Sequence, residues 1–238
     1  MFKLLLAFII PFSSAWSQER FQDSYRQELY EMASQNHRPV SGYSRAREIV
    51  MQKLHLEQDN RGYYIEDVYC QKDFRSNVGP NRMPNHQNIN IEHTWPQSRF
   101  SSAFRKSIQK NDLHHLYPTD SRSNSTRGNH HFSQFKGNAR PVNGDCELSQ
   151  LGTISQTGSS GFEPPFEHKG NVARALFYFS IRYKIRIPQH EEFFLRQWHL
   201  IDPVDEVERE RNELIERHQG NRNPFIDDPQ LTDLITDF

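Results

Sequence analysis

Glu92 and His93 stand next to each other in the sequence, and Asn124 follows in a second polar segment. Five of the twelve histidines fall between His93 and His131. Hydrolysis of a phosphodiester needs an activated water, neutralisation of the phosphate charge and stabilisation of the leaving oxygen. A histidine can take the proton from water, and a hard divalent cation prefers oxygen ligands such as those of Glu and Asn. These residue types therefore indicate metal-assisted hydrolysis of a phosphodiester.

The Glu92-His93 pair lies at the end of a segment with polar and apolar residues in alternation. Residues 88–93 have a period of two, which predicts a half-buried strand that Trp95-Pro96 ends. Strict alternation would send Glu92 and His93 to opposite faces of a sheet. Both side chains reach one site only if the strand ends or twists there.

Asn124 belongs to a segment that predicts a helix. Residues 112–118 indicate a compact loop or short strand, and Thr119 or Asp120 could cap a helix that runs to about residue 129. Asn has a poor helix propensity because its side chain competes with the backbone. A residue that breaks a local rule in this way is a candidate for function.

The rest of the chain predicts more helix than strand. Further helices are predicted at about residues 23–36, 44–54, 172–183 and 205–219. The signals are apolar residues at helical spacing and residues typical of helix caps and turns. Pro188 is expected to end the third of these helices, and Gly220 to follow the fourth. Residues 61–70 indicate a strand or a buried extended segment, whereas residues 133–161 are rich in Gly, Ser and Asn and predict mostly loop. With no internal repeat and no long linker, we expect one α+β domain in which helices outnumber strands.

The two polar segments resemble those of the ββα-metal (His-Me finger) nucleases, and in particular the bacterial endonuclease I family of periplasmic and extracellular nucleases. In that family a Glu-His pair ends the second strand, as Glu92-His93 would here. An Asp-x-His-x-Leu-x-Pro loop follows, and its counterparts are Asp112, His114, Leu116 and Pro118. The metal-binding Asn lies in the next helix, six residues after that proline, which is the position of Asn124.

Further matches extend the resemblance from about residue 23 over most of the chain. They are Arg127 with Asn129, Gly161-Phe162-Glu163-Pro164-Pro165, Lys169-Gly170, Val172-Ala173-Arg174 and Asn221-Arg222-Asn223-Pro224-Phe225. The resemblance implies a mostly helical α+β domain around a ββα-metal finger core.

The resemblance also implies a role for each central residue. His93 resembles the general base, and Glu92 and Asn124 resemble the ligands of one Mg²⁺, with Mn²⁺ or Ca²⁺ as other metals. Asn129 is the rival to Asn124 as the amide ligand. The family often has Asn where His115 stands, and many members carry more disulfides than the single pair that this chain allows.

Neighbouring histidines allow a second interpretation. The pairs His114-His115 and His130-His131 could bind zinc, but no acid or Cys stands at the usual ligand spacing. We therefore expect them to orient the site or to meet phosphates.

Basic residues cluster around the two polar segments. Between Arg99 and Arg140 the sequence has eight Lys and Arg residues but only two Asp, although the whole chain has a formal net charge of −1. This asymmetry indicates a local anion-binding face. Arg99, Arg122 and Arg127 are the candidates for phosphate contact, and a solvated surface is the alternative for each of them.

The first residues have the layout of a secretory signal peptide. Lys3 precedes the short apolar run from Leu4 to Phe12, and small residues follow, so that cleavage after Ala15 or Ser17 fits. A buried N-terminal helix is the alternative. Residues 18–238 would then form one nuclease domain, and no later stretch approaches the ~20 apolar residues of a membrane span. We expect a periplasmic or secreted monomer that has no membrane contact once the signal is removed.

Cys70 and Cys146 are the two cysteines of the chain. An oxidising compartment favours a disulfide between them, whereas two unrelated buried thiols would be ordinary in a cytosolic protein.

Taken together, these patterns predict an endonuclease that hydrolyses DNA and RNA without sequence specificity, since no base-reading module is evident. Two alternatives remain: a secreted nucleic-acid-binding module without catalysis, and a ribonuclease restricted to RNA. Loss of cleavage in a His93 variant would separate catalysis from binding.

Overall fold

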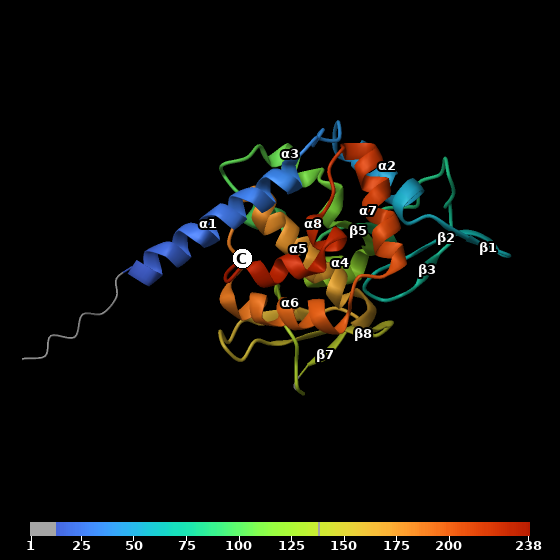
Figure 1. Cartoon of the computed structure of the whole chain (residues 1–238). Coiled ribbons are helices and arrows are strands. Elements are labelled where there is room, and N and C mark those ends of the chain that lie inside the picture. Colours follow the sequence, from blue (N-terminus) through green and yellow to red (C-terminus); the bar gives the residue numbers. More distant parts are fainter. Residues whose placement is uncertain (1–12, 138) are drawn as a thin grey trace, which may run out of the picture.

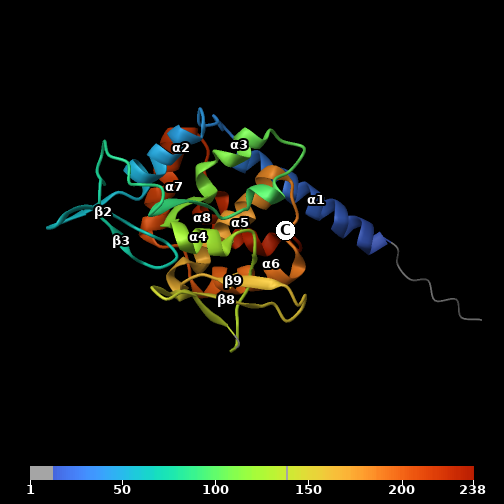
Figure 2. The same cartoon turned by 180° about the vertical axis from the view of Figure 1, so that it is seen from behind.

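The computed structural model describes residues 13–137 and 139–238 (Figures 1 and 2). The α-helices are α1 (Ser13–Ser34), α2 (Tyr43–Ile49), α3 (Lys106–Lys110), α4 (Ser121–Arg127), α5 (Lys169–Tyr183), α6 (Gln189–Ile201), α7 (Glu206–Gln219) and α8 (Pro224–Asp227). The strands are β1 (Glu57–Asp59), β2 (Gly62–Glu66), β3 (Asp73–Phe74), β4 (Ile89–His93), β5 (Leu116–Asp120), β6 (His131–Phe132), β7 (Arg140–Asn143), β8 (Cys146–Thr153) and β9 (Ser160–Glu163). More of the described residues lie in helices than in strands, which confirms the α+β class.

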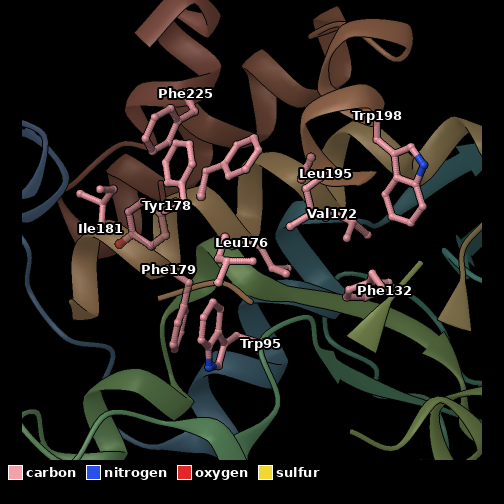
Figure 3. Close-up of a cluster of buried hydrophobic side chains, with 14 of the residues drawn as sticks. Trp95, Phe132, Val172, Leu176, Tyr178, Phe179, Ile181, Leu195, Trp198 and Phe225 are labelled. Atoms are coloured by element: carbon pink, nitrogen blue, oxygen red, sulfur yellow. The ribbon is translucent and has the colours of Figure 1, made fainter. Parts of the chain in front are cut away.

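Helix α5 forms the centre of the molecule. All of its residues except Asn171 are buried, and α1, α6 and α8 pack against it (Figure 1). Apolar side chains dominate its surface, and polar residues such as Arg174 are buried as well, as expected for a helix that other elements enclose. Figure 3 shows Phe179 of α5 beside Trp95, and their stacked rings have centroids 5.2 Å apart.

The end of α5 differs from the prediction. The helix stops at Tyr183, because Lys184 adopts a left-handed conformation with φ of 52°. Pro188 does not end this helix but is the N-cap residue of α6. A proline is well tolerated at the start of a helix, where the backbone N–H has no intrahelical partner.

Strands β4 and β5 and helix α4 form the ββα unit that the sequence predicts. The two strands pair antiparallel, with Ile89 opposite Asp120 and His93 opposite Leu116. Helix α4 starts directly after β5, and the Asp120 carboxylate accepts the N–H groups of Arg122 at 3.0 Å and Ser123 at 2.9 Å. This cap fixes where α4 begins and therefore which of its side chains face β4.

Residues 133–161, predicted to be mostly loop, instead contain most of a sheet. Its four strands have the order β6-β9-β8-β7, with β8 antiparallel to β7 and β9, and β6 parallel to β9. The prediction was wrong because β8 does not alternate between buried and exposed residues, and both Gly152 and Gly161 lie within strands. The other sheets are β1-β2-β3 and β4-β5.

Helices α6 and α7 cover the side of α5 that carries Arg174. Helix α6 was not predicted, whereas α7 begins after its N-cap Asp205 and ends before Gly220, as expected. Gly220 has φ of +84°, and a Cβ there would lie 2.3 Å from the Asn36 carbonyl oxygen, so only glycine fits this turn. The α7 face turned inward carries polar side chains, among them Glu208, which binds Arg174.

The structure tests only part of the predictions for the N-terminal residues. Residues 1–12 of the expected signal peptide lie outside the described residues, and α1 begins at Ser13, ahead of the predicted start near residue 23. The second helix starts at Tyr43, and its N-cap Gly42 lies two residues before the expected cap Ser44. Among the helices of residues 13–137 and 139–238, none has the length and apolar character needed to span a membrane.

Candidate active site

Glu92 is the penultimate residue of β4, and its carboxylate is enclosed by protein. The Tyr69 hydroxyl donates to Oε1 at 2.8 Å, and the Arg127 guanidinium lies 2.9 Å from the same oxygen. Burial raises the pKa of Glu92, while Arg127 and the Tyr69 hydroxyl oppose this effect. An acid and a base that are both buried need such close pairing, because an isolated charge would be expensive to desolvate.

Asn124 lies on α4 and faces β4. Its amide Nδ2 donates to the Asn90 side-chain oxygen at 2.6 Å and to the Ile91 carbonyl at 3.1 Å. With both amide hydrogens used in this way, the orientation of the amide group is set and Oδ1 points away from these acceptors. Among the described residues, Asn124 Oδ1 has no hydrogen-bond donor.

His93 ends β4 and is held by its ring. Its Nε2 lies 3.1 Å from the Lys110 carbonyl oxygen, and a carbonyl only accepts, so the proton resides on Nε2. Tyr43 stacks on the imidazole at 5.5 Å between ring centroids, and His115 meets it edge-on at 5.3 Å. Burial lowers the pKa of His93 to about 3, so the ring is neutral at pH 7 and Nδ1 carries a free lone pair.

The three groups do not all share one face of the hairpin. Asn90 and Glu92 are two residues apart and therefore point to the same side of β4, where Asn124 and Arg127 of α4 meet them. His93 points to the other side, as strict alternation requires. The structure thus places Glu92 and Asn124 on the same side of the hairpin, and His93 at the end of β4.

Arg127 was predicted to contact phosphates, but the structure buries its side chain. The side chain is 1% exposed, and besides Glu92 it donates to the carbonyls of His93 at 3.2 Å and Thr94 at 2.7 Å. The guanidinium also lies 4.5 Å from the Phe132 ring centroid. These contacts tie α4 to the end of β4, so Arg127 is placed to hold Glu92 and not to meet a substrate from solvent.

Arg99 belongs to a polar cluster that sequence reasoning missed. Its guanidinium lies 2.7 Å from His131 Nδ1 and 3.3 Å from the carboxylate of Glu191, which also lies 2.6 Å from His131. Glu191 is buried on α6, and its second oxygen accepts the Phe132 N–H at 2.8 Å. Its pKa is lowered against the effect of burial by His131, Arg99 and the Phe132 N–H, so the carboxylate is charged.

Nothing in the neighbourhood of Glu191 in the sequence points to this role, since its partners lie 92 and 60 residues away. The helix that carries Glu191 was itself not predicted. An acid in the first turn of a helix is favourable in general, so the position of Glu191 gives no signal of this role.

The remaining candidates are spread around the hairpin. His115 is buried beside His93, and its Nε2 lies 2.8 Å from the Gln109 carbonyl, whereas His114 turns toward Tyr178 and the Asn221 carbonyl. Burial lowers the pKa of both His114 and His115 to about 4. Asn129 and Arg122 are exposed, and Asn129 Nδ2 reaches the Ser98 hydroxyl at 3.5 Å. Asn129 therefore lies with the Arg99 segment and not opposite Glu92.

Glu92 and Asn124 fit a hard cation that keeps much of its water. Both are oxygen donors on adjoining elements, and Asn124 Oδ1 is the atom that its hydrogen bonds leave available. Among residues 13–137 and 139–238, no group of three or more His, Cys, Asp or Glu side chains could hold a metal ion. The donor set suits Mg²⁺ with two protein ligands better than zinc, which takes three or four nitrogen, sulfur or carboxylate ligands.

The disulfide expected from the sequence is confirmed. Cys70 and Cys146 are joined, with an S–S distance of 2.01 Å, and the bond links the segment after β2 to the start of β8. Tyr69, the donor to Glu92, is the residue next to Cys70. The disulfide therefore anchors one of the two side chains that hold the Glu92 carboxylate.

The sequence of this chain is similar to those of known nucleases. The family model for endonuclease I matches residues 18–230. An extracellular ribonuclease of Bacillus subtilis (strain 168) is 37% identical over 164 residues, which cover 61% of this chain and 53% of that protein. A periplasmic deoxyribonuclease of Aeromonas hydrophila is 30% identical over 128 residues, which cover 53% of this chain and 51% of the relative.

An endonuclease-1 of Buchnera aphidicola subsp. Acyrthosiphon pisum (strain APS) is 31% identical over 117 residues, which cover 49% of this chain and 44% of that protein. The chain thus spans about half the length of these curated relatives.

Proposed function

Because this chain belongs to the endonuclease I family, we propose that it is a metal-dependent endonuclease that hydrolyses phosphodiester bonds of DNA and RNA. The family expected from the Glu92-His93 and Asn124 segments is confirmed by the match over residues 18–230. The observation that carries the proposed chemistry is the ββα unit. Two oxygen donors lie on one face of β4, and a neutral histidine stands at its end.

In this proposal His93 is the general base. The Lys110 carbonyl holds the proton on Nε2, which leaves Nδ1 to take a proton from the attacking water. The water oxygen then bonds to phosphorus as the bond to the leaving oxygen breaks. Tyr43 and His115 pack against the ring and keep it from rotating away from the strand end.

Glu92 and Asn124 would hold the divalent cation, with Mg²⁺ as the expected ion and Mn²⁺ or Ca²⁺ as substitutes. When bound, such a cation supplies charge neutralisation at the phosphate and the leaving oxygen. Tyr69 and Arg127 orient the Glu92 carboxylate, and the Asn90 side chain and the Ile91 carbonyl orient the Asn124 amide. Arg99 and Arg122 remain the candidates for contact with the phosphates of the substrate.

Substitution of His93 tests the proposal. We expect the wild-type protein to degrade plasmid DNA, single-stranded DNA and RNA in Mg²⁺ and to stop in EDTA, as agarose gels would show. His93→Ala should lose at least about two orders of magnitude in rate, because general base catalysis contributes 10²–10⁴-fold. The variant should still retain DNA in a filter-binding assay, with affinity that falls as salt rises.

His86→Ala is the matched control, since His86 is an exposed histidine in the segment before β4. Its cleavage rate should equal that of the wild type. Cleavage by His93→Ala within a few-fold of the wild type would contradict the role of His93. Retention of DNA by the wild type without cleavage at any metal concentration would instead support a binding module without catalysis.

A preference for RNA is the second candidate function. The relatives that bear the name ribonuclease are more similar to this chain than those named deoxyribonuclease. A site that acts on the phosphate hardly senses the 2′-hydroxyl, so we favour both substrates. Cleavage of RNA with intact plasmid and single-stranded DNA in the same gels would establish the restricted activity.

Export to the periplasm or the medium is part of the same proposal. It is supported by the signal-like residues 1–17, by relatives whose names place them outside the cytoplasm, and by the Cys70–Cys146 bond. Mass spectrometry of the N-terminus after expression would distinguish cleavage after Ala15 from cleavage after Ser17.

A further inference from the structure

A pocket of about 530 Å³ lies between α6, the segment after β6 and the turn that joins β8 to β9. Phe135, Phe193 and Phe194 provide aromatic walls, and Gln134, Lys136 and Gln197 provide polar groups. Neither Asp nor Glu is among its lining residues, although α6 and the elements after it are rich in acids. A mixed aromatic and amide lining with one cation favours an occupant that is flat, polar at its edges and attached to negative charge.

Phe135 is a fixed wall because the sheet is built to accept it. Gly152 on β8 and Gly161 on β9 are paired across the strands, and a Cβ on Gly152 would lie 2.7 Å from the Phe135 ring. A Cβ on Gly161 would lie 3.2 Å from the same ring. The Phe135 N–H also donates to the Glu163 carboxylate at 2.8 Å. The two glycines therefore let an aromatic ring lie directly against the backbone of the sheet.

Phe193 supplies a second aromatic surface that is open to solvent. Its side chain lies on α6 and is 54% exposed, and Phe194 meets it edge-on with ring centroids 5.2 Å apart. A large exposed ring at the rim of a pocket is available for stacking by a planar group, and any nucleobase has a suitable face.

Gln134 can donate to the edge of such a group. Its side-chain oxygen accepts the Trp198 indole N–H at 3.0 Å, which fixes the amide so that the nitrogen is its free end. That nitrogen has no acceptor among residues 13–137 and 139–238. A fixed amide donor beside an aromatic wall matches the keto oxygens of the nucleobases.

The pocket is joined to the candidate active site through the segment that follows α4. Phe132, whose ring centroid lies 4.5 Å from the Arg127 guanidinium that binds Glu92, precedes Phe135 by three residues. Three extended residues span at most about 11 Å. A strand cut at the end of β4 could therefore reach this pocket within a few nucleotides.

From this arrangement we propose that the pocket binds an unpaired nucleobase of the substrate, on one side of the cleaved phosphate. The base would stack on Phe193 and Phe135, accept a hydrogen bond from Gln134, and have its phosphate near Lys136. This inference rests on the proposed function and adds to it a preference for single-stranded segments, whose bases are free to turn outward.

The experiment compares two probes of equal charge: a fluorescein-labelled oligothymidylate and an abasic oligonucleotide of the same length. Binding is measured by fluorescence anisotropy in the His93→Ala background, so that no cleavage interferes. We expect oligothymidylate to bind more tightly than the abasic probe. Phe193→Ala should weaken oligothymidylate by about fivefold or more, since one base–aromatic stack is worth ~1–3 kcal/mol. It should leave the abasic probe unchanged, and Phe193→Trp should restore the difference between the two probes.

Leu200→Ala is the matched control, because Leu200 is an exposed apolar residue further along α6 and outside the pocket. It should not alter either affinity. Equal affinity of the wild-type pocket for both probes, or an unchanged affinity in Phe193→Ala, would overturn the proposal. A chain that cuts no nucleic acid but shows the Phe193 effect would overturn the proposed endonuclease and support the base pocket, so the two failures can be told apart.

Discussion

At the scale of single residues, Glu92 has two neighbours that decide how it can act. Arg127 compensates the charge of a carboxylate that burial would otherwise neutralise, and Tyr69 fixes one of its oxygens. Arg127 was expected to contact phosphates, or to lie on a solvated surface, because it is close to the motif in the sequence. The sequence could not reveal its actual place, since an arginine on a short helix has the same spacing whether it faces solvent or a buried acid.

Removal of the Tyr69 hydroxyl should weaken metal use more than it weakens the fold. We expect Tyr69→Phe to raise the Mg²⁺ concentration for half-maximal cleavage by about tenfold or more, because a hydrogen bond to a charged group such as Glu92 contributes about 1.5–3 kcal/mol. A Mg²⁺ titration of the cleavage rate measures this. Tyr64→Phe is the control, as Tyr64 donates to Glu57 on the exposed β1–β2 hairpin. An identical Mg²⁺ dependence in both variants would contradict the part given to Tyr69.

At the scale of elements, strong local patterns were predictable and long-range ones were not. The period of residues 88–93 predicted β4, and the apolar spacing of residues 172–183 predicted most of α5. The strands β7 to β9 were missed because polar residues and glycines fill positions that pairing with neighbouring strands stabilises. The candidate pair could be found because Glu92 and His93 are adjacent in the sequence, whereas Glu191 reaches its partners only through the packing of α6.

The contact of α5 with α7 depends on a buried ion pair. Arg174 and Glu208 are each 1% exposed in their side chains and lie 2.6 Å apart, and Arg174 also donates to the Asp202 carbonyl at 2.9 Å. Loss of one partner leaves the other as an uncompensated buried charge. We therefore expect Arg174→Met to lower the free energy of unfolding by about 3–5 kcal/mol in urea denaturation.

Arg209→Met provides the matched comparison, since Arg209 pairs with Glu206 in an exposed position of α7. Its effect should stay within about 1 kcal/mol, as for other surface pairs. A similar loss of unfolding free energy in both variants would mean that the buried Arg174–Glu208 pair stabilises the fold no more than the exposed pair does.

At the scale of the whole molecule, buried histidines should limit stability in acid. Burial and the nearby Arg211 and Arg174 lower the pKa of His168 to about 3, from about 6.5 in an unfolded chain. Because the pKa of His168 is lower in the folded chain, the unfolded chain takes up the proton at a higher pH than the folded chain. This histidine therefore costs no stability above about pH 6.5, and the free energy of unfolding falls as the pH drops from there toward the folded pKa. His114 and His115 act in the same direction.

We expect His168→Phe to lose less stability between pH 7 and pH 5 than the wild type, by about 2 kcal/mol. Phe keeps a ring against Tyr117, which packs edge-on to His168 at 4.8 Å, and cannot take a proton. Urea denaturation at the two pH values measures the difference. Equal losses in both proteins would show that His168 does not titrate differently on folding.

The Cys70–Cys146 disulfide closes a long loop of the chain, because the two cysteines are 76 positions apart in the sequence. The segment between the two cysteines contains Glu92, His93 and Asn124, so every central residue of the candidate site lies within one closed loop. A newly made chain in a reducing cytoplasm would hold that loop open, and the Tyr69 segment would lack its anchor. If the chain is the exported nuclease proposed above, its cleavage of the nucleic acids of the producing cell would be lowest before export and would rise once the disulfide has formed.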